Sequence, residues 1–192
     1  MDTTRDSGKE EEIRQIITWM DADNKKLDYN FDYSIISQIP LPTTWELPGT
    51  LFLGPYITEV NPVEKLAELK VTLLISVGFK KPIIPNDQFS GVQKVYDIPD
   101  CGDPETVKKM AQAAEEITPL IREALRAGKN VYIHCRGGVS RSATAVLHFL
   151  HSHGMSAIRA VQYLKKYRVC IYPNTGFVRF IVYLPDSSMS HL

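Results

Sequence analysis

The pattern of hydrophobic and polar positions changes character near residue 50. Before that point the main helical signal is an apolar stripe with the spacing i, i+3, i+4 and i+7, formed by Ile13, Ile16, Ile17 and Met20. This stripe predicts a short amphipathic helix that begins after Asp6 or Ser7 as the capping residue. Residues 40–48 contain three prolines, which predicts an extended connector.

From residue 50 onward, strand and helix signals alternate. Short apolar runs predict strands at 50–53, 71–77, 92–98 and 131–135. The continuous run at 71–77 is typical of a strand that is buried on both faces. Helical spacing and capping residues predict helices at 61–70, 107–125, 141–153, 156–167 and 175–184. The alternation predicts an α/β domain with a parallel or mixed central sheet.

Composition and charge narrow the class of protein. The chain has 192 residues, of which 44% are hydrophobic and 23% charged, so it is expected to form one globular domain with a short appendage. No apolar stretch approaches the ~20 residues that a bilayer helix needs. The first twelve residues lack the apolar segment of a secretory signal, which predicts a cytoplasmic or nuclear protein that does not associate with membranes.

The charged residues are unevenly placed. Basic and acidic residues balance at 22 each, which argues against a nucleic-acid-binding function. The first 32 positions nevertheless hold nine acidic and five basic residues, so the remainder is mildly basic and suited to anions. We therefore expect an acidic N-terminal arm at 1–44, a catalytic domain at 45–185 and a flexible tail at 186–192.

The segment 131–146 contains the candidate catalytic residues. Cys135 ends a predicted strand and Arg141 begins a predicted helix, so the backbone N–H groups between them can converge on an anion at the positive end of the helix. Both effects stabilise a thiolate, which is the nucleophilic form of cysteine. Arg141 offers a planar fork to two phosphate oxygens. Ser142 can donate a hydrogen bond to the sulfur and help it to leave.

The predicted phosphate-binding residues are the five loop positions and the arginine, namely Arg136, Gly137, Gly138, Val139, Ser140 and Arg141. The two glycines permit close backbone approach to a phosphate and allow a positive φ. A buried structural cysteine beside an unrelated arginine is the competing interpretation. The number of matching features within one strand–loop–helix unit argues against it.

The loop resembles the signature of cysteine-based protein tyrosine phosphatases, HCxxGxxR followed by Ser or Thr, and the stretch GVSRSAT is similar to dual-specificity phosphatases. The resemblance implies a central mixed, mostly parallel sheet of about five strands flanked by helices. It also implies phosphorylated protein substrates and neither metal nor organic cofactor. The flanks resemble the serine/threonine/tyrosine-interacting group, which includes inactive members without the cysteine. This chain retains Cys135.

The resemblance also implies a general acid about thirty residues before the cysteine, on a loop between a strand and a long helix. Asp103 precedes Cys135 by 32 positions and is the favoured candidate. Asp100 lies in an Ile-Pro-Asp context that resembles some relatives, so it remains the alternative. One of the two aspartates is expected to cap the helix that begins near Pro104.

The stretch 168–177, RVCIYPNTGF, resembles the RxxxxPNxGF element of these phosphatases. The resemblance implies that its asparagine caps the last helix and that its aromatic residue holds the end of the domain. Three histidines, His148, His151 and His153, lie close together in sequence, but no carboxylate or cysteine completes a metal site beside them.

The sequence therefore predicts a phosphoprotein phosphatase that hydrolyses phosphotyrosine, phosphoserine or phosphothreonine through a phosphocysteine intermediate. The alternative hypothesis is a phosphoprotein-binding adaptor that turns over very slowly.

Overall fold

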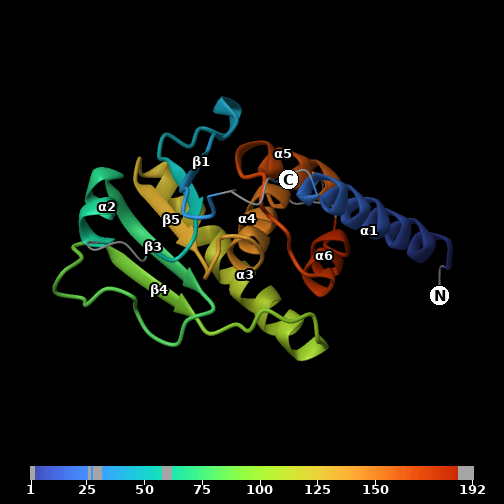
Figure 1. The fold of residues 1–192 in the computed structure, drawn as a ribbon. Coiled ribbons are helices and arrows are strands. Elements are labelled where there is room, and N and C mark those ends of the chain that lie inside the picture. Colours follow the sequence, from blue (N-terminus) through green and yellow to red (C-terminus); the bar gives the residue numbers. More distant parts are fainter. Residues whose placement is uncertain (1–2, 26, 28–31, 58–61, 186–192) are drawn as a thin grey trace.

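The computed structural model describes residues 3–25, 27, 32–57 and 62–185. Its centre is a five-stranded sheet in the order β1-β2-β5-β3-β4 (Figure 1). The strands are β1 (Ser37–Ile39), β2 (Leu51–Gly54), β3 (Val71–Val77), β4 (Val92–Tyr96) and β5 (Asn130–His134). All neighbouring strands are parallel except β1 and β2, which are antiparallel. The predicted α/β class and mixed, mostly parallel sheet are confirmed.

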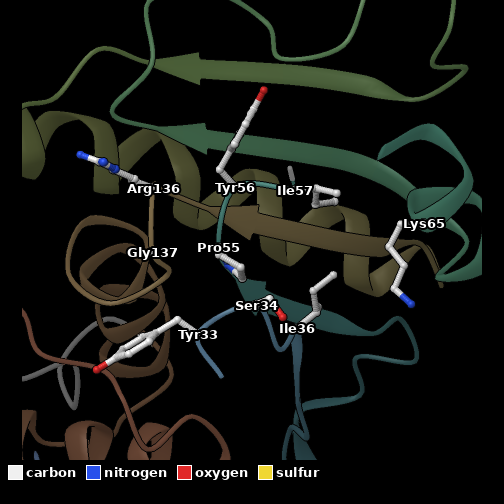
Figure 2. A pocket seen from close by; sticks show the side chains of 9 residues that line it. All are labelled: Tyr33, Ser34, Ile36, Pro55, Tyr56, Ile57, Lys65, Arg136 and Gly137. Carbon is white, nitrogen blue, oxygen red and sulfur yellow. The ribbon is translucent and has the colours of Figure 1, made fainter. Parts of the chain in front are cut away.

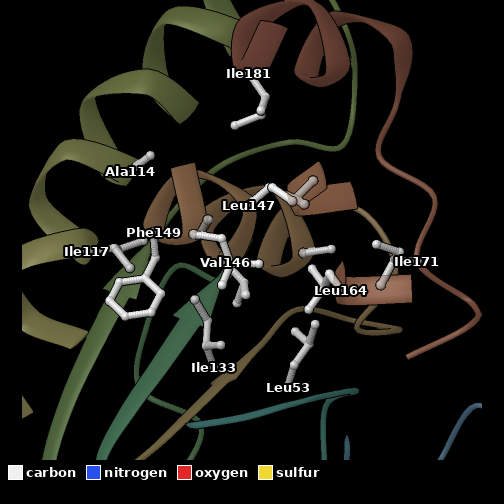
Figure 3. Packing of buried hydrophobic residues seen from close by; sticks show 14 of the residues in the cluster. Leu53, Ala114, Ile117, Ile133, Val146, Leu147, Phe149, Leu164, Ile171 and Ile181 are labelled. Atoms are coloured by element: carbon white, nitrogen blue, oxygen red, sulfur yellow. The ribbon is translucent and has the colours of Figure 1, made fainter. Parts of the chain in front are cut away.

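Side chains of the central strands alternate between two hydrophobic clusters, as the period of two in a strand requires. The larger cluster contains Leu53 of β2 and Ile133 of β5, together with residues of the helices that cover this face (Figure 3). The smaller cluster, on the other face, contains Phe52 and Tyr132, which are neighbours of those residues in sequence. Both faces are covered, and this explains why β3 and β5 are nearly continuous apolar runs.

Helices cover the sheet on both faces. The smaller cluster is closed by α2 (Pro62–Glu68), and its predicted cap Asn61 lies outside the described residues. The larger cluster is covered by α3 (Pro104–Arg126), α4 (Arg141–His151), α5 (Ala157–Tyr167) and α6 (Thr175–Val182). Asn174 caps α6 by accepting a hydrogen bond from the backbone N–H of Phe177 at 3.1 Å, so the predicted cap is confirmed. No helix in the described ranges is long and apolar enough to cross a membrane.

The N-terminal helix α1 (Thr3–Asn24) is longer than the sequence predicted. Asp6 and Ser7 lie inside it, so the prediction that one of them is the cap is wrong. Contacts with the rest of the protein explain the extension: Glu10 forms an ion pair with Arg179 of α6, and the Asp6 carboxylate accepts a hydrogen bond from the Tyr183 hydroxyl. The predicted apolar stripe is buried and belongs to the larger cluster.

Two elements between α1 and β2 were not predicted, and the second of them lies inside the predicted extended connector at 40–48. The short strand β1 pairs with β2, and Ile39 lies opposite Leu51. A 3₁₀ turn, η1 (Thr43–Trp45), follows and ends at Glu46, whose φ of 53° is left-handed. Three residues are too few to show an alternating pattern, so β1 depends on its partner strand rather than on its own sequence. The division of the chain at residue 45 stays a prediction.

The packing of α1 predicts that its apolar stripe contributes to global stability. Ile16 is 1% exposed, so Ile16→Ala is expected to lower the free energy of unfolding by about 2–4 kcal/mol through lost burial and a residual cavity. Urea denaturation measures this change. Thr18→Ala, on the exposed face of the same helix, is the control and should stay within about 0.5 kcal/mol of wild type. Equal, small effects of both changes would contradict the docking of α1.

Candidate active site

The loop that follows β5 surrounds a buried cysteine. Cys135 is 1% exposed and lies at the carboxyl end of β5, and α4 begins six residues later at Arg141. Gly138 has a φ of +63°, and a Cβ atom built on it would lie 2.3 Å from the carbonyl oxygen of Gly54. Only glycine fits this left-handed position against the end of β2. The loop is therefore pressed against the sheet and held in one conformation.

Each of four consecutive carbonyl groups in the loop accepts a hydrogen bond from a partner outside it. The Arg136 carbonyl accepts from the Tyr56 N–H at 3.0 Å, and the Val139 carbonyl accepts from the Tyr172 N–H at 2.8 Å. The carbonyls of Gly137 and Gly138 both accept from the Arg168 guanidinium, at 3.0 and 2.7 Å.

These contacts orient the N–H groups of the loop. In a planar trans peptide the N–H points opposite to the preceding carbonyl. The N–H groups of residues 137–140 therefore point away from the four bracing partners. A row of such N–H groups, followed by a helix N-terminus, forms a nest for an anion.

Arg168 braces the loop from a distant part of the chain, a role that the sequence alone does not indicate. It is 2% exposed and donates five hydrogen bonds, to the two loop glycines and to the segment around β1, where Ile35 and Ser37 accept. A buried guanidinium needs such a complete set of acceptors, because burial removes its hydration. The only available signal was its place at the start of the RVCIYPNTGF element.

The surroundings of Cys135 favour the thiolate. Burial raises the pKa of the thiol, but four other contributions outweigh it and lower the pKa overall. The largest is the hydrogen bond that the Ser142 hydroxyl donates to the sulfur at 3.2 Å. Backbone N–H groups of Ser142 and Val139 and the charge of Arg141 add to it. The structure thus brings Cys135, Ser142 and Arg141 together, as the sequence predicted.

The Arg141 guanidinium lies across Gly78, where a Cβ atom would come within 2.0 Å of Nη1. Its Nη1 donates a long hydrogen bond of 3.4 Å to the Ile98 carbonyl. Its Nε is buried and lies 3.4 Å from the Asp100 carboxylate, close enough for an ion pair but without hydrogen-bond geometry. The guanidinium is therefore held in place while its hydrogen-bonding capacity is only partly used by the protein.

Asp100 belongs to the same group of side chains. Its Oδ1 accepts hydrogen bonds from the Ser140 hydroxyl at 2.7 Å and from the Asn174 amide at 3.1 Å, and its Oδ2 faces Arg141. The carboxylate side chain is 36% exposed, so it also reaches solvent. A carboxyl group in this place can exchange a proton with a group bound at Arg141.

Asp103 has a different environment. It caps α3: its carboxylate accepts hydrogen bonds from the Cys101 thiol at 2.9 Å and from the Thr106 N–H at 3.1 Å. These bonds, from Cys101 first, lower the pKa of Asp103 well below its usual range. None of its described contacts reaches the phosphate loop. The geometry therefore favours Asp100, the alternative, over Asp103 as the general acid.

His134, the last residue of β5, lies directly before the loop. Burial lowers its pKa to about 4, so the imidazole is neutral at physiological pH. It forms a 2.7 Å hydrogen bond with the Ser76 hydroxyl, which ties β5 to β3 next to Cys135. His134 is the histidine of the HCxxGxxR motif, whereas no sequence pattern points to Ser76.

The three C-terminal histidines face separate partners. His148 bonds to Thr118, His151 to the carbonyls of Met155 and Pro185, and His153 stacks on Trp45. Within the described ranges, no group of three or more His, Cys, Asp or Glu side chains is arranged to hold a metal ion. The candidate site is instead made of a thiol nucleophile, Cys135, a cation, Arg141, and a carboxyl group, Asp100.

Comparison with known proteins places this geometry in a family. The family pattern described as "Dual specificity phosphatase, catalytic domain" matches residues 51–185. Dual specificity protein phosphatase 1 of Arabidopsis thaliana is 32% identical over 138 residues, which are 69% of this chain and 66% of that protein. The human serine/threonine/tyrosine-interacting protein is 33% identical over 137 residues, 69% of this chain and 59% of that protein. The chain thus spans less than two thirds of the length of both relatives.

A solved structure agrees with these sequence matches. The crystal structure of human DUSP28 superimposes with a TM-score of 0.57 and 28% sequence identity, over 68% of this chain and 87% of that chain. Since the family pattern spans strands β2 to β5, the loop around Cys135 and Arg141, and the element that contains Arg168, the chain belongs to the dual-specificity phosphatase family.

Proposed function

We propose that this chain is an active protein phosphatase that hydrolyses phosphotyrosine, phosphoserine or phosphothreonine in proteins through a phosphocysteine at Cys135. One observation carries the proposal. The sulfur of Cys135 accepts a hydrogen bond from Ser142 at 3.2 Å, inside a loop in which four consecutive carbonyls accept hydrogen bonds from partners outside the loop. This arrangement stabilises negative charge on sulfur and on a phosphoryl group at the same place.

In the first step the Cys135 thiolate attacks phosphorus. A sulfur–phosphorus bond forms and the bond from phosphorus to the substrate oxygen breaks. The loop N–H groups and the Arg141 guanidinium hold the three equatorial oxygens while charge spreads over them. The leaving oxygen takes a proton from the Asp100 carboxyl group, which lies beside Arg141.

In the second step water attacks the phosphocysteine. Asp100, now a carboxylate, accepts the proton of the water, the oxygen–phosphorus bond forms and inorganic phosphate is released. The sulfur–phosphorus bond breaks and returns the thiolate. Ser142 stabilises that leaving sulfur with the hydrogen bond it already donates.

The assignment of the acid to Asp100 has a chemical basis in the contacts of both aspartates. A phosphoryl group bound by Arg141 would lie next to the Asp100 carboxyl group, which faces the same guanidinium. Hydrogen bonds from the Cys101 thiol and from Thr106 lower the pKa of Asp103, which makes it a poor proton donor at neutral pH. The adaptor hypothesis predicts the same phosphate binding without turnover, so steady-state kinetics distinguish an enzyme from an adaptor.

The role of Ser142 predicts a change in the ionisation of Cys135. Because its hydroxyl favours the thiolate, Ser142→Ala is expected to shift the midpoint of Cys135 alkylation to higher pH. The measurement is the rate of iodoacetamide labelling against pH, resolved by peptide mass spectrometry. Ser90→Ala, at an exposed position, is the control and should leave the midpoint unchanged.

Cys170 supplies an internal reference, since burial raises the pKa of its thiol. Its peptide should be labelled only at higher pH than the Cys135 peptide. If Cys135 were labelled at no lower pH than Cys170, the proposed thiolate stabilisation would be refuted.

The role of Asp100 predicts a dependence on the leaving group. A general acid matters most for a poor leaving group, so Asp100→Asn should lower turnover of a phosphotyrosine peptide by about 100-fold or more. Turnover of an activated aryl phosphate should fall much less. The basic limb of the pH–rate profile, which reports loss of the proton from the acid, should flatten. Steady-state kinetics with both substrates measure these effects.

Asp103→Asn is the matched control, because asparagine is also a favourable cap residue and α3 keeps its N-terminus. It should retain both kinetic signatures, and Cys135→Ser defines the background rate. The reverse pattern would assign the acid to Asp103. A wild-type rate equal to that of Cys135→Ser would exclude an enzyme and support the adaptor.

A further inference from the structure

A cavity of about 240 Å³ lies directly beside the phosphate loop (Figure 2). We call it the flank pocket. Its walls are Ile36 before β1, Pro55 and Ile57 after β2, and Arg136 and Gly137 of the loop itself. Gly137 therefore belongs both to this pocket and to the phosphate-binding loop. A group bound in the flank pocket would be adjacent to a phosphoryl group bound at Cys135.

The size and lining of the pocket indicate what it can hold. Pockets for small molecules typically measure about 300–1,000 Å³. The flank pocket is smaller. Besides the aliphatic side chains of Ile36, Pro55 and Ile57, its lining includes Tyr33, Tyr56 and the small Ser34, so it is mostly apolar and suits a single apolar side chain on an extended peptide.

The rim of the pocket is basic. Arg136 and Lys65 of α2 lie at opposite ends of the cavity in Figure 2, and no acidic residue lines it among the residues that the structure describes. Lys65 Nζ lies 3.0 Å from Glu68, but this pair is exposed and holds the lysine only weakly. The Arg136 side chain is exposed and has no ion pair within the described ranges. The rim is complementary to a carboxylate.

The pocket is preformed by the same residue that orients the loop. Arg168 donates to the carbonyls of Ile35 and Gly137, and so fixes the segment before β1 against the phosphate loop. The distance between these two walls of the pocket is fixed, because one guanidinium is hydrogen-bonded to both. A preformed pocket loses little conformational entropy on binding.

We propose that the flank pocket binds the substrate protein next to its phosphorylated residue, and that it selects an apolar side chain accompanied by a carboxylate. This inference rests on the proposed function, since it assumes a phosphoprotein at Cys135. Burial of the apolar side chain supplies affinity, and the basic rim supplies the preference for acidic over basic neighbours.

Binding to the Cys135→Ser protein tests the inference without turnover. Four phosphotyrosine peptides are compared by titration calorimetry; they differ only in the pair of residues beside phosphotyrosine, which is leucine–glutamate, leucine–lysine, serine–glutamate or serine–lysine. The leucine–glutamate peptide is expected to bind about tenfold or more tightly than the serine–lysine peptide. Equal affinities, or tighter binding of the lysine peptides, would overturn the inference.

Two further changes locate the preference in the pocket. Ser34→Trp, which places a large side chain at the wall, should remove the leucine preference, and Lys65→Gln should reduce the glutamate preference several-fold. Lys109→Gln is the matched control: Lys109 is also an exposed helical lysine near a carboxylate, Glu105 at 3.8 Å, but lies outside the pocket. Thermal melts verify that each variant is folded. If Ser34→Trp is unstable, Lys65→Gln still tests the pocket, because the Lys65 side chain is partly exposed. Preferences that survive both changes would place the selection elsewhere.

Wild-type turnover of an aryl phosphate distinguishes the two ways of failing. Turnover together with four equal peptide affinities would retain the phosphatase and reject the flank pocket. Discriminating affinities that the pocket variants abolish, in a protein without turnover, would support the flank pocket and reject the phosphatase.

Discussion

The buried guanidinium of Arg168 is the interaction on which the rest of the site depends. A cationic side chain that is 2% exposed is costly unless every N–H finds an acceptor, and here five hydrogen bonds are donated to carbonyls and a hydroxyl. Two of those acceptors, Gly137 and Gly138, are in the phosphate loop. By turning their carbonyls outward, Arg168 leaves the loop N–H groups to face the anion, so the nest exists before any substrate arrives.

Preorganisation explains how a buried cysteine can be a nucleophile. Burial alone would keep the Cys135 thiol protonated and inert. The Ser142 hydroxyl, two backbone N–H groups and Arg141 reverse that effect and lower its pKa. In the proposed mechanism the same groups stabilise the charge of a transferring phosphoryl group, so one set of fixed dipoles would serve both the nucleophile and the transition state. Gly78 adds to this by leaving room for Arg141 over the end of β3.

Much of this arrangement could be predicted from the sequence because it is local. The strand–loop–helix around Cys135 and Arg141 depends on residues close together in the chain, and so do the caps Asp103 and Asn174. The contacts that were missed are long-range. Arg168 reaches the loop across 30 residues, and β1 forms only because β2 lies beside it. The pattern of hydrophobic and polar residues around Arg168 and in β1 does not indicate which distant residues they contact.

The choice between Asp100 and Asp103 shows the same limit. The distance in sequence from Cys135 favoured Asp103. That distance does not indicate which of the two carboxylates caps the N-terminus of α3. In the structure Asp103 takes that place, and Asp100, three residues earlier, turns towards Ser140 and Arg141. The length of α1 could not be predicted for a similar reason, because its first turns are stabilised by an ion pair with α6 and by a hydrogen bond from Tyr183, the residue that follows α6.

The central claim is that the preorganised loop makes Cys135 a nucleophile towards phosphorus. Rapid acid quenching of wild-type protein during turnover of a phosphotyrosine peptide, followed by peptide mass spectrometry, tests it most directly. We expect the mass of one phosphoryl group on the peptide that contains Cys135, and none on the peptides of Cys101 and Cys170. Release of phosphate with no phosphoryl group on Cys135 at any quench time would contradict the account.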